Sequence, residues 1–170
     1  MRSRLDDSLS LVEQTTERIR DVMADLRPPV LDDYGLVATL HWYAEQFERR
    51  TDIAIAVEGE EPVPRLAARV ENALFRIAQE ALTNVAKHAR ATHVTVTVQV
   101  GVENIHLVVA DDGIGFDPAY LTEPDESRGW GLLTMTERAE AIGGRCWIET
   151  GPGQGTQVIV EVARSAGHEL

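Results

Sequence analysis

Residues 65–89 read RLAARVENALFRIAQEALTNVAKHA, a stretch that contains neither proline nor glycine. Its apolar residues recur at steps of three and four and form one stripe, made of Val70, Leu74, Ile77, Ala81 and Val85. A helix with a single apolar stripe packs that face against a core. We therefore predict a central packed helix over residues 65–89.

The segments after this helix are patterned as strands. Valines at 94, 96, 98 and 100 alternate with polar residues, and IHLVVA (105–110) follows after a short turn, which predicts an antiparallel hairpin. The segments RCWIET (145–150) and TQVIVEV (156–162) flank the turn GPGQG (151–155) and predict two more strands. The segment IAIAV (53–57) predicts a strand before the central helix.

Two further helices are expected in the same domain. Residues 30–50 predict one amphipathic helix, whose apolar side carries Leu36, Leu40, Tyr43, Ala44 and Phe47. Residues 132–142 predict another, which ends at the capping pair Gly143-Gly144. Strands in one layer and helices in the other define an α+β fold, a two-layer α/β sandwich with a mixed sheet.

The first residues of the chain carry a different pattern. A coiled-coil-type seam recurs at steps of four and three and stops at Arg27-Pro28-Pro29; it consists of Leu5, Leu9, Val12, Thr16, Ile19, Met23 and Leu26. Such a helix needs a partner, so we expect the chain to begin within a larger dimerisation bundle. The predicted organisation is a bundle helix at 1–29, a compact domain at 30–163 and a tail at 164–170.

Composition excludes several classes of function. The formal charge of −12 argues against nucleic acid or an anionic membrane surface as the main partner. A single cysteine, Cys146, excludes an internal disulfide framework and a cysteine metal cage. There is no apolar run long enough to span a bilayer, and MRSRLDDSLS lacks the apolar stretch of a signal peptide. We expect a cytoplasmic location without direct membrane contact, whether a soluble or a membrane-bound sensor precedes the chain.

Polar residues on the central helix are the first candidates for chemistry. Glu80, Asn84, Lys87 and His88 stand at i, i+4, i+7 and i+8, so they share one edge of the helix. Alone, this edge is better explained as a solvated helix face. The hexapeptide DDGIGF (111–116) ends a predicted strand, and it is equally well explained as a turn.

The order of the glycine-rich segments favours a functional explanation. The polar stretch DPAYLTEPDES (117–127) is long and leads to Arg128-Gly129-Trp130-Gly131 at a helix start, the pattern of a mobile lid over about 117–128. Glycines at a helix N-terminus let phosphate oxygens approach free backbone N–H groups. Gly155-Thr156 then opens the last strand.

Taken together, QEALTNVAKHA (79–89), DDGIGF (111–116), RGWGLLTMTERAEAIGG (128–144) and GQGT (153–156) resemble the N, G1 and G2 boxes and closing strand of a GHKL (Bergerat) ATPase. LRPPVLDDYGL (26–36) and GLLTMTERAEAIGG (131–144) are similar to the nitrate-sensor-like subfamily of sensor histidine kinases. The resemblance covers nearly the whole chain and implies the Bergerat ATP-binding fold.

The resemblance also implies a role for each matching residue. Asp111 accepts a hydrogen bond from the adenine amine, with Gly115 close to the base and Thr156 supporting that pocket through its hydroxyl, and Gly113 is a further nucleotide-binding residue. Asn84 is the Mg²⁺ ligand, which suits a cation that takes few protein oxygens. The implied phosphate-side residues are Lys87, His88, Gly129 and Gly131. Glu80 matches the acidic residue that polarises the attacking histidine or water.

The implied function is that of a histidine kinase catalytic domain. It binds Mg-ATP and transfers the γ-phosphoryl group to an upstream histidine, which lies in the dimerisation helices of the homodimeric full-length protein. The phosphoryl group then passes to a response regulator. None of His41, His88, His93, His106 and His168 fits a phosphoacceptor box, so we expect no autophosphorylation by this chain alone. An anti-sigma-type serine kinase and a non-catalytic nucleotide-binding or interaction module stay open as alternatives; a standalone ATPase of the topoisomerase or chaperone type ranks last.

Overall fold

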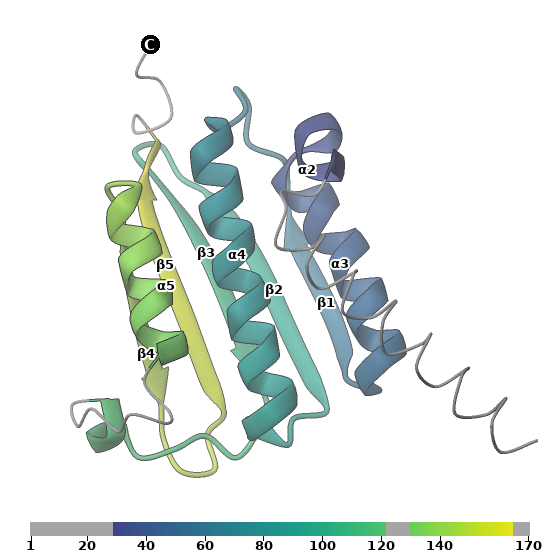
Figure 1. Cartoon of the computed structure of the whole chain (residues 1–170), viewed down its shortest axis with the longest axis vertical. Coiled ribbons are helices and arrows are strands. Elements are labelled where there is room, and N and C mark those ends of the chain that lie inside the picture. The colour runs from purple at the N-terminus through teal and green to yellow at the C-terminus, as the bar shows by residue number, and fades with distance from the viewer. Residues whose placement is uncertain (1–28, 122–129, 165–170) are drawn as a thin grey trace, which may run out of the picture.

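The computed structural model describes residues 29–121 and 130–164. These residues form two layers, with the helices covering one face of a single sheet (Figure 1). The α+β two-layer sandwich expected from the sequence is therefore confirmed. The seam at residues 5–26, the greater part of the expected lid and the tail lie outside the described residues, so the domain boundaries at 29 and 163 stay predictions.

The sheet has five strands in the order β1-β2-β3-β5-β4. The strands are β1 (Ala54–Gly59), β2 (His93–Val100), β3 (Asn104–Asp111), β4 (Arg145–Thr150) and β5 (Thr156–Ala163). Strand β1 pairs with β2 in parallel, whereas the other three pairings are antiparallel, so the sheet is mixed as expected. Alternate residues of β2 and β3 are buried, as the valine alternation predicted.

Three long helices cover the sheet: α3 (Leu36–Thr51), α4 (Ala68–Asn84) and α5 (Trp130–Ala141). Helix α4 lies between the other two in Figure 1. Its predicted stripe is buried, with Val70, Leu74, Ile77 and Ala81 at most 2% exposed. At the end of α5, Gly143 has a φ of 72°, and Gly144 N–H bonds to Ala139 O, so the predicted glycine cap is confirmed.

The single helix predicted over residues 30–50 is wrong, because the chain breaks at Gly35. A short helix, α2 (Pro29–Tyr34), precedes it, and α3 begins at Leu36. Gly35 has a φ of 89°, which a residue with a side chain rarely adopts. The Glu61 carboxylate accepts the Leu36 and Val37 N–H groups at 2.7 and 2.8 Å, which satisfies the first amides of α3.

The segment between β1 and α4, which carries Glu61, also holds the end of α2. Arg65 donates to the carbonyls of Leu31 and Asp32 at 2.7 and 2.8 Å. Its guanidinium also pairs in bidentate fashion with Glu71, whose side chain is only 1% exposed. The corner between α2 and α3 is therefore fixed from both sides by residues 61–71.

The central helix differs from its prediction near its end. The α-helical part of α4 stops at Asn84, and Val85–Ala89 form a π-helical turn that ends at Arg90, whose φ is 53°. A π-turn has more residues per turn than an α-helix, so it rotates later side chains away from their expected positions. Lys87 and His88 lie in this turn and are exposed.

Candidate functional site

The site is built at one end of the sheet, where β3, β5 and β4 present a row of polar residues. Asp111 ends β3 and lies directly opposite Thr156, the first residue of β5. Thr156 in turn lies opposite Thr150, the last residue of β4. Each of the three stands an even number of residues from the core-facing side chains of its own strand, such as Val109, Val158 and Ile148, so the whole row lies on the helix-covered face of the sheet.

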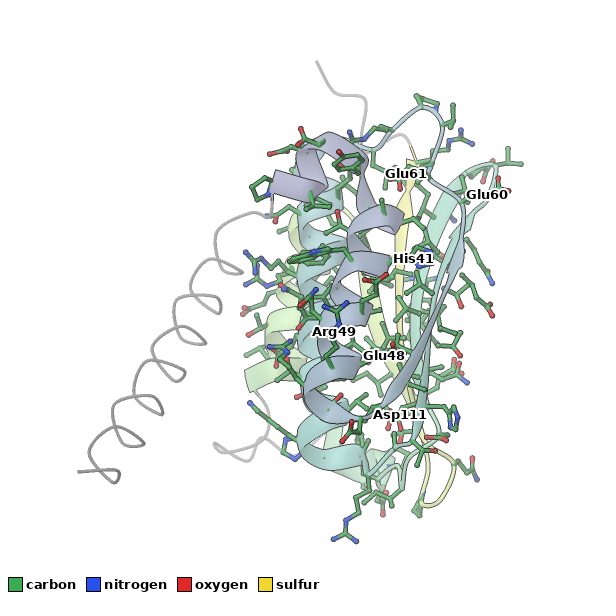
Figure 2. The ribbon with its side chains drawn as sticks, turned by 90° about the vertical axis from the view of Figure 1, so that its right-hand side faces the viewer. His41, Glu48, Arg49, Glu60, Glu61 and Asp111 are labelled. Carbon is green, nitrogen blue, oxygen red and sulfur yellow. The ribbon has the colours of Figure 1, made fainter. Side chains whose placement is uncertain are left out.

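Asp111 is the partly buried carboxylate of this row, and Figure 2 shows it at the end of the molecule opposite Glu60 and Glu61. Burial raises its pKa, while hydrogen bonds from the backbone N–H groups of Gly113 and Thr156 act in the opposite direction. The Gly113 N–H contact to Oδ1 measures 2.8 Å. A carboxylate has more acceptor sites than these two amides use, so Asp111 can accept a further hydrogen bond.

Asp112, the neighbouring acid, has a different role. Its carboxylate accepts the backbone N–H groups of Thr92 and His93 at 2.7 and 2.9 Å and the Thr92 hydroxyl at 2.8 Å. These bonds, the one from the His93 backbone foremost, hold the pKa of Asp112 well below its usual range. Asp112 therefore pins the start of β2 to the end of β3, and only Asp111 of the acidic pair faces the helix layer.

Glycines surround Asp111 because neighbouring backbone leaves no space for a side chain. A Cβ on Gly155 would lie 2.0 Å from Asp111 O, and Gly155 has a φ of 70°. One on Gly115 would lie 2.1 Å from Gly151 O, and one on Gly113 would lie 2.3 Å from Ala89 O. The DDGIGF loop is thus packed between the end of the central helix and the turn at residues 151–155.

Glu80 and Asn84 lie on α4 one helical turn apart, and both face the first turn of α5. A Cβ on Gly131 would lie 2.3 Å from Glu80 Oε1 and 3.4 Å from Asn84 Nδ2. Within the described residues, neither side chain takes part in a hydrogen bond or an ion pair. The structure therefore brings together Glu80, Asn84 and Gly131, whereas Gly129 lies outside the described residues.

Two groups of the predicted site are separated from each other. Glu80, Asn84 and Gly131 form one group between α4 and α5, and Asp111, Gly113, Gly115 and Thr156 form the other at the strand ends. Lys87 and His88 lie between them in sequence, on the exposed π-helical turn. The π-turn links the groups, because the carbonyl of its last residue, Ala89, accepts the Ile114 N–H at 2.8 Å.

Sequence reasoning missed Thr150. Its hydroxyl donates to Gly155 O at 2.9 Å, accepts the Phe116 N–H at 3.2 Å and lies 3.2 Å from the Thr156 hydroxyl. The signal was present, since TQVIVEV pairs with RCWIET across GPGQG, which brings residue 150 opposite Thr156. His93 Nδ1 lies 3.1 Å from Asp112 Oδ2, and His106 Nε2 lies 2.9 Å from Glu161 Oε2.

A sheet covered on one face by helices, with a glycine-enclosed aspartate at a strand end, defines the class of ATP-binding α+β domain that the resemblance implied. Residues 69–166 match the family described as "Histidine kinase-, DNA gyrase B-, and HSP90-like ATPase". This range is more than half of the chain and contains all ten predicted site residues. The chain belongs to this family.

Curated relatives extend the comparison. The chain is 38% identical over 162 residues to an uncharacterized sensor-like histidine kinase of Chloroflexus aurantiacus. This alignment covers 93% of the chain and 27% of the relative. The chain is also 37% identical over 156 residues to the signal transduction histidine-protein kinase/phosphatase DegS of Brevibacillus brevis. This second alignment covers 92% of the chain and 39% of that protein. The chain thus spans well under half the length of these relatives.

Solved structures show the same fold. The histidine kinase domain of the Erythrobacter litoralis EL346 blue-light activated histidine kinase aligns with a TM-score of 0.63 and 23% identity, over 78% of this chain and 66% of that one. Full-length ShkA in complex with AMPPNP aligns with a TM-score of 0.58 and 24% identity, over 75% of this chain and 29% of that one. At these identities the likeness concerns the fold.

The described residues also limit other classes of site. They contain no group of three or more His, Cys, Asp or Glu side chains placed to hold a metal ion. Among the helices that the structure describes, none combines the length and apolar character needed to cross a membrane.

Proposed function

We propose that the chain is the catalytic domain of a sensor histidine kinase, which binds Mg-ATP and donates the γ-phosphoryl group to a histidine side chain. The observation that carries the proposal is the glycine-enclosed Asp111 opposite Thr156, in a chain of this ATPase family. The relatives named as histidine kinases, and the likeness in fold to ShkA, which was crystallised with AMPPNP, support it.

The adenine end of ATP belongs at Asp111. The carboxylate is partly buried and keeps acceptor capacity after its bonds to the backbone, so it can accept the exocyclic amine of adenine. Gly113 and Gly115 expose backbone where a flat base needs close approach. Thr156, directly beside Asp111, presents its hydroxyl to the same edge of the base.

The phosphate end belongs between α4 and α5. Gly131 lies in the first turn of α5 and Gly129 precedes this helix in the sequence, and at a helix start free N–H groups and the helix dipole favour phosphate oxygens. The Asn84 amide makes no hydrogen bond to the residues that the structure describes, and it fits Mg²⁺, because this cation keeps several waters and needs few protein oxygens. The bound metal would neutralise phosphate charge, and Lys87, which lies beside His88 on the exposed π-turn, would add positive charge nearby.

Glu80 is the candidate that acts on the nucleophile. Its carboxylate lies against Gly131 and makes no hydrogen bond within the described part of the chain, so it can accept one from an incoming imidazole N–H. The phosphoacceptor histidine would belong to a dimerisation helix of the homodimeric parent, on the cytoplasmic side. A response regulator would then receive the phosphoryl group.

The metal assignment is tested by calorimetric titration with ATP in Mg²⁺ and in EDTA. Asn84→Ala should weaken binding in Mg²⁺ more than in EDTA, since the amide oxygen contacts only the metal. Asn72→Ala is the matched control, because it lies on the same helix twelve residues away, about 18 Å along the axis. Equal losses with and without metal in Asn84→Ala would contradict the assignment.

The catalytic assignment is tested in the longer parent protein with γ-labelled ATP. Glu80→Gln should keep ATP affinity and lower the rate of acid-labile phosphohistidine formation by about 10²- to 10⁴-fold, the usual contribution of a general base. Glu140→Gln, an exposed position on α5, serves as the matched control. A Glu80→Gln rate within a factor of two of the control would remove Glu80 from the mechanism.

A further inference from the structure

Thr150 is placed at the centre of the hydrogen bonds that join the two loops of the site. Its hydroxyl contacts the Phe116 N–H from the DDGIGF loop, the Gly155 carbonyl from the 151–155 turn and the hydroxyl of Thr156. The side chain is partly buried at the end of β4, on the helix-covered face of the sheet. One hydroxyl therefore connects both loops to the strand that carries Thr156.

The number of protons on these hydroxyls fixes the direction of the bonds. A threonine hydroxyl has one proton to donate and two lone pairs to accept. The Thr150 proton is directed to Gly155 O at 2.9 Å, and one lone pair accepts the Phe116 N–H at 3.2 Å. The remaining lone pair faces the Thr156 hydroxyl at 3.2 Å. Because a carbonyl oxygen can only accept, we assign the Thr150 proton to Gly155 O and Thr156 as the donor to Thr150.

This direction determines what Thr156 offers to a ligand. With its proton committed to Thr150, the Thr156 hydroxyl can only accept from a bound base. Asp111 lies directly opposite Thr156, and its carboxylate also accepts. Two adjacent acceptors suit an amino group at position 6 of a purine, as in adenine. They repel the carbonyl oxygen at that position in guanine or hypoxanthine.

We propose that Thr150 is a positioning residue that makes Thr156 an acceptor and thereby raises the selectivity of the site for 6-aminopurine over 6-oxopurine nucleotides. The inference rests on the proposed nucleotide-binding function, with the base at Asp111. Thr150 touches neither base nor phosphate in this scheme and acts through Thr156. When Thr150 loses its hydroxyl, Thr156 becomes free to rotate and donate to a 6-oxo group.

The test compares ATP with ITP, because hypoxanthine changes the position-6 group without adding the 2-amino group of guanine. Calorimetry on the whole chain should show that Thr150→Val lowers the ATP-to-ITP affinity ratio by between about twofold and tenfold, the range for one neutral hydrogen bond. Thr150→Ser keeps the hydroxyl and should restore the ratio. Thr150→Ala provides a second hydroxyl-free variant in case valine prevents folding.

Thr39→Val is the matched control, since Thr39 is buried and its hydroxyl bonds to Gly35 O at 2.6 Å, far from the site at the start of α3. Its ATP-to-ITP ratio should equal that of the wild type. An unchanged ratio in folded Thr150→Val or Thr150→Ala, with selective binding by the wild type, would overturn the role of Thr150. Absence of ATP binding by the wild type would instead overturn the proposed function on which it rests.

Discussion

The buried ion pair between Arg65 and Glu71 offers a direct prediction about what holds the domain together. Glu71 is 1% exposed and receives two bonds from the Arg65 guanidinium, at 3.0 and 2.8 Å. The same guanidinium holds the carbonyls of Leu31 and Asp32 at the end of α2. The change Glu71→Gln removes the charge and replaces one of the two acceptor oxygens with an NH₂ group, which cannot accept a hydrogen bond from Arg65.

The expected loss follows from the burial of the two partners. Breaking a buried ion pair by removal of one partner destabilises a protein by about 3–5 kcal/mol. The Arg65 side chain is 42% exposed and can turn to water, so we expect the lower end, about 3 kcal/mol. At roughly 3–4 °C per kcal/mol for a domain of this size, the midpoint of thermal unfolding should fall by about 10 °C.

The assay is thermal and urea unfolding followed by circular dichroism, with Glu45→Gln as the matched control. Glu45 pairs with Arg49 at 3.8 Å, and both side chains are at least 66% exposed, so its change should alter stability by less than about 0.5 kcal/mol. In a double-mutant cycle, Arg65→Met should cost less stability in the Glu71→Gln background than in the wild type, and the cost that remains is the loss of its bonds to Leu31 O and Asp32 O. A Glu71→Gln loss no larger than that of Glu45→Gln would refute the view that this pair fixes the corner between α2 and α3.

Three further predictions concern the site and its surroundings. Gly155→Ala should abolish ATP binding, because its Cβ would lie 2.0 Å from Asp111 O. Gly153→Ala is the control: Gly153 has a similar φ of 74°, but no atom lies within 4 Å of its Cβ position, so this change should cost only about 1 kcal/mol of stability and leave binding intact. Calorimetry and melting curves compare the two variants. Burial raises the pKa of Asp111, so its carboxylate becomes protonated at a higher pH than that of an ordinary aspartate. ATP affinity should therefore fall as the pH is lowered from neutral, and Asp111→Asn should lack this dependence. An identical pH profile of ATP affinity in both proteins would contradict the assignment. Burial raises the pKa of the Cys146 thiol to about 11, so a thiol reagent at pH 8 should modify it more slowly than the same cysteine in urea; equal rates would contradict its burial.

The regular elements were predictable because their side-chain periods are local properties. The stripe from Val70 to Ala81 repeats at helical spacing, and the valines of β2 alternate, so both elements follow from neighbouring residues alone. The same alternation extends through Leu107 and Val109 to Asp111, which explains why that aspartate, and not Asp112, faces the helices.

The features that escaped prediction depend on contacts between distant residues. The break at Gly35 is stabilised by Glu61, about 25 residues further along, and residues 30–50 carry no local signal of that partner. The π-turn at Val85–Ala89 changes the helical phase without changing the residue types that define the apolar stripe. Thr150 acquires its role only through the pairing of β4 with β5.

The glycine motifs predicted the location of the site better than its geometry. Gly113, Gly115 and Gly155 do lie around Asp111, because each packs against backbone that excludes a side chain. The exposure of Lys87 and His88 was not predictable, since it depends on the π-turn. The roles of these residues, of Gly129 and Gly131, and of Glu80 and Asn84 toward ATP and Mg²⁺ stay predictions.

The most direct test of the proposed function is calorimetric titration of the wild type and Asp111→Asn with ATP and GTP in the presence of Mg²⁺. The account predicts that the wild type binds ATP in preference to GTP. It also predicts that Asp111→Asn weakens ATP binding by about 10- to 100-fold, as expected for loss of a hydrogen bond to a charged acceptor. Wild-type protein that binds neither nucleotide, or Asp111→Asn that binds ATP as tightly as the wild type, would contradict it.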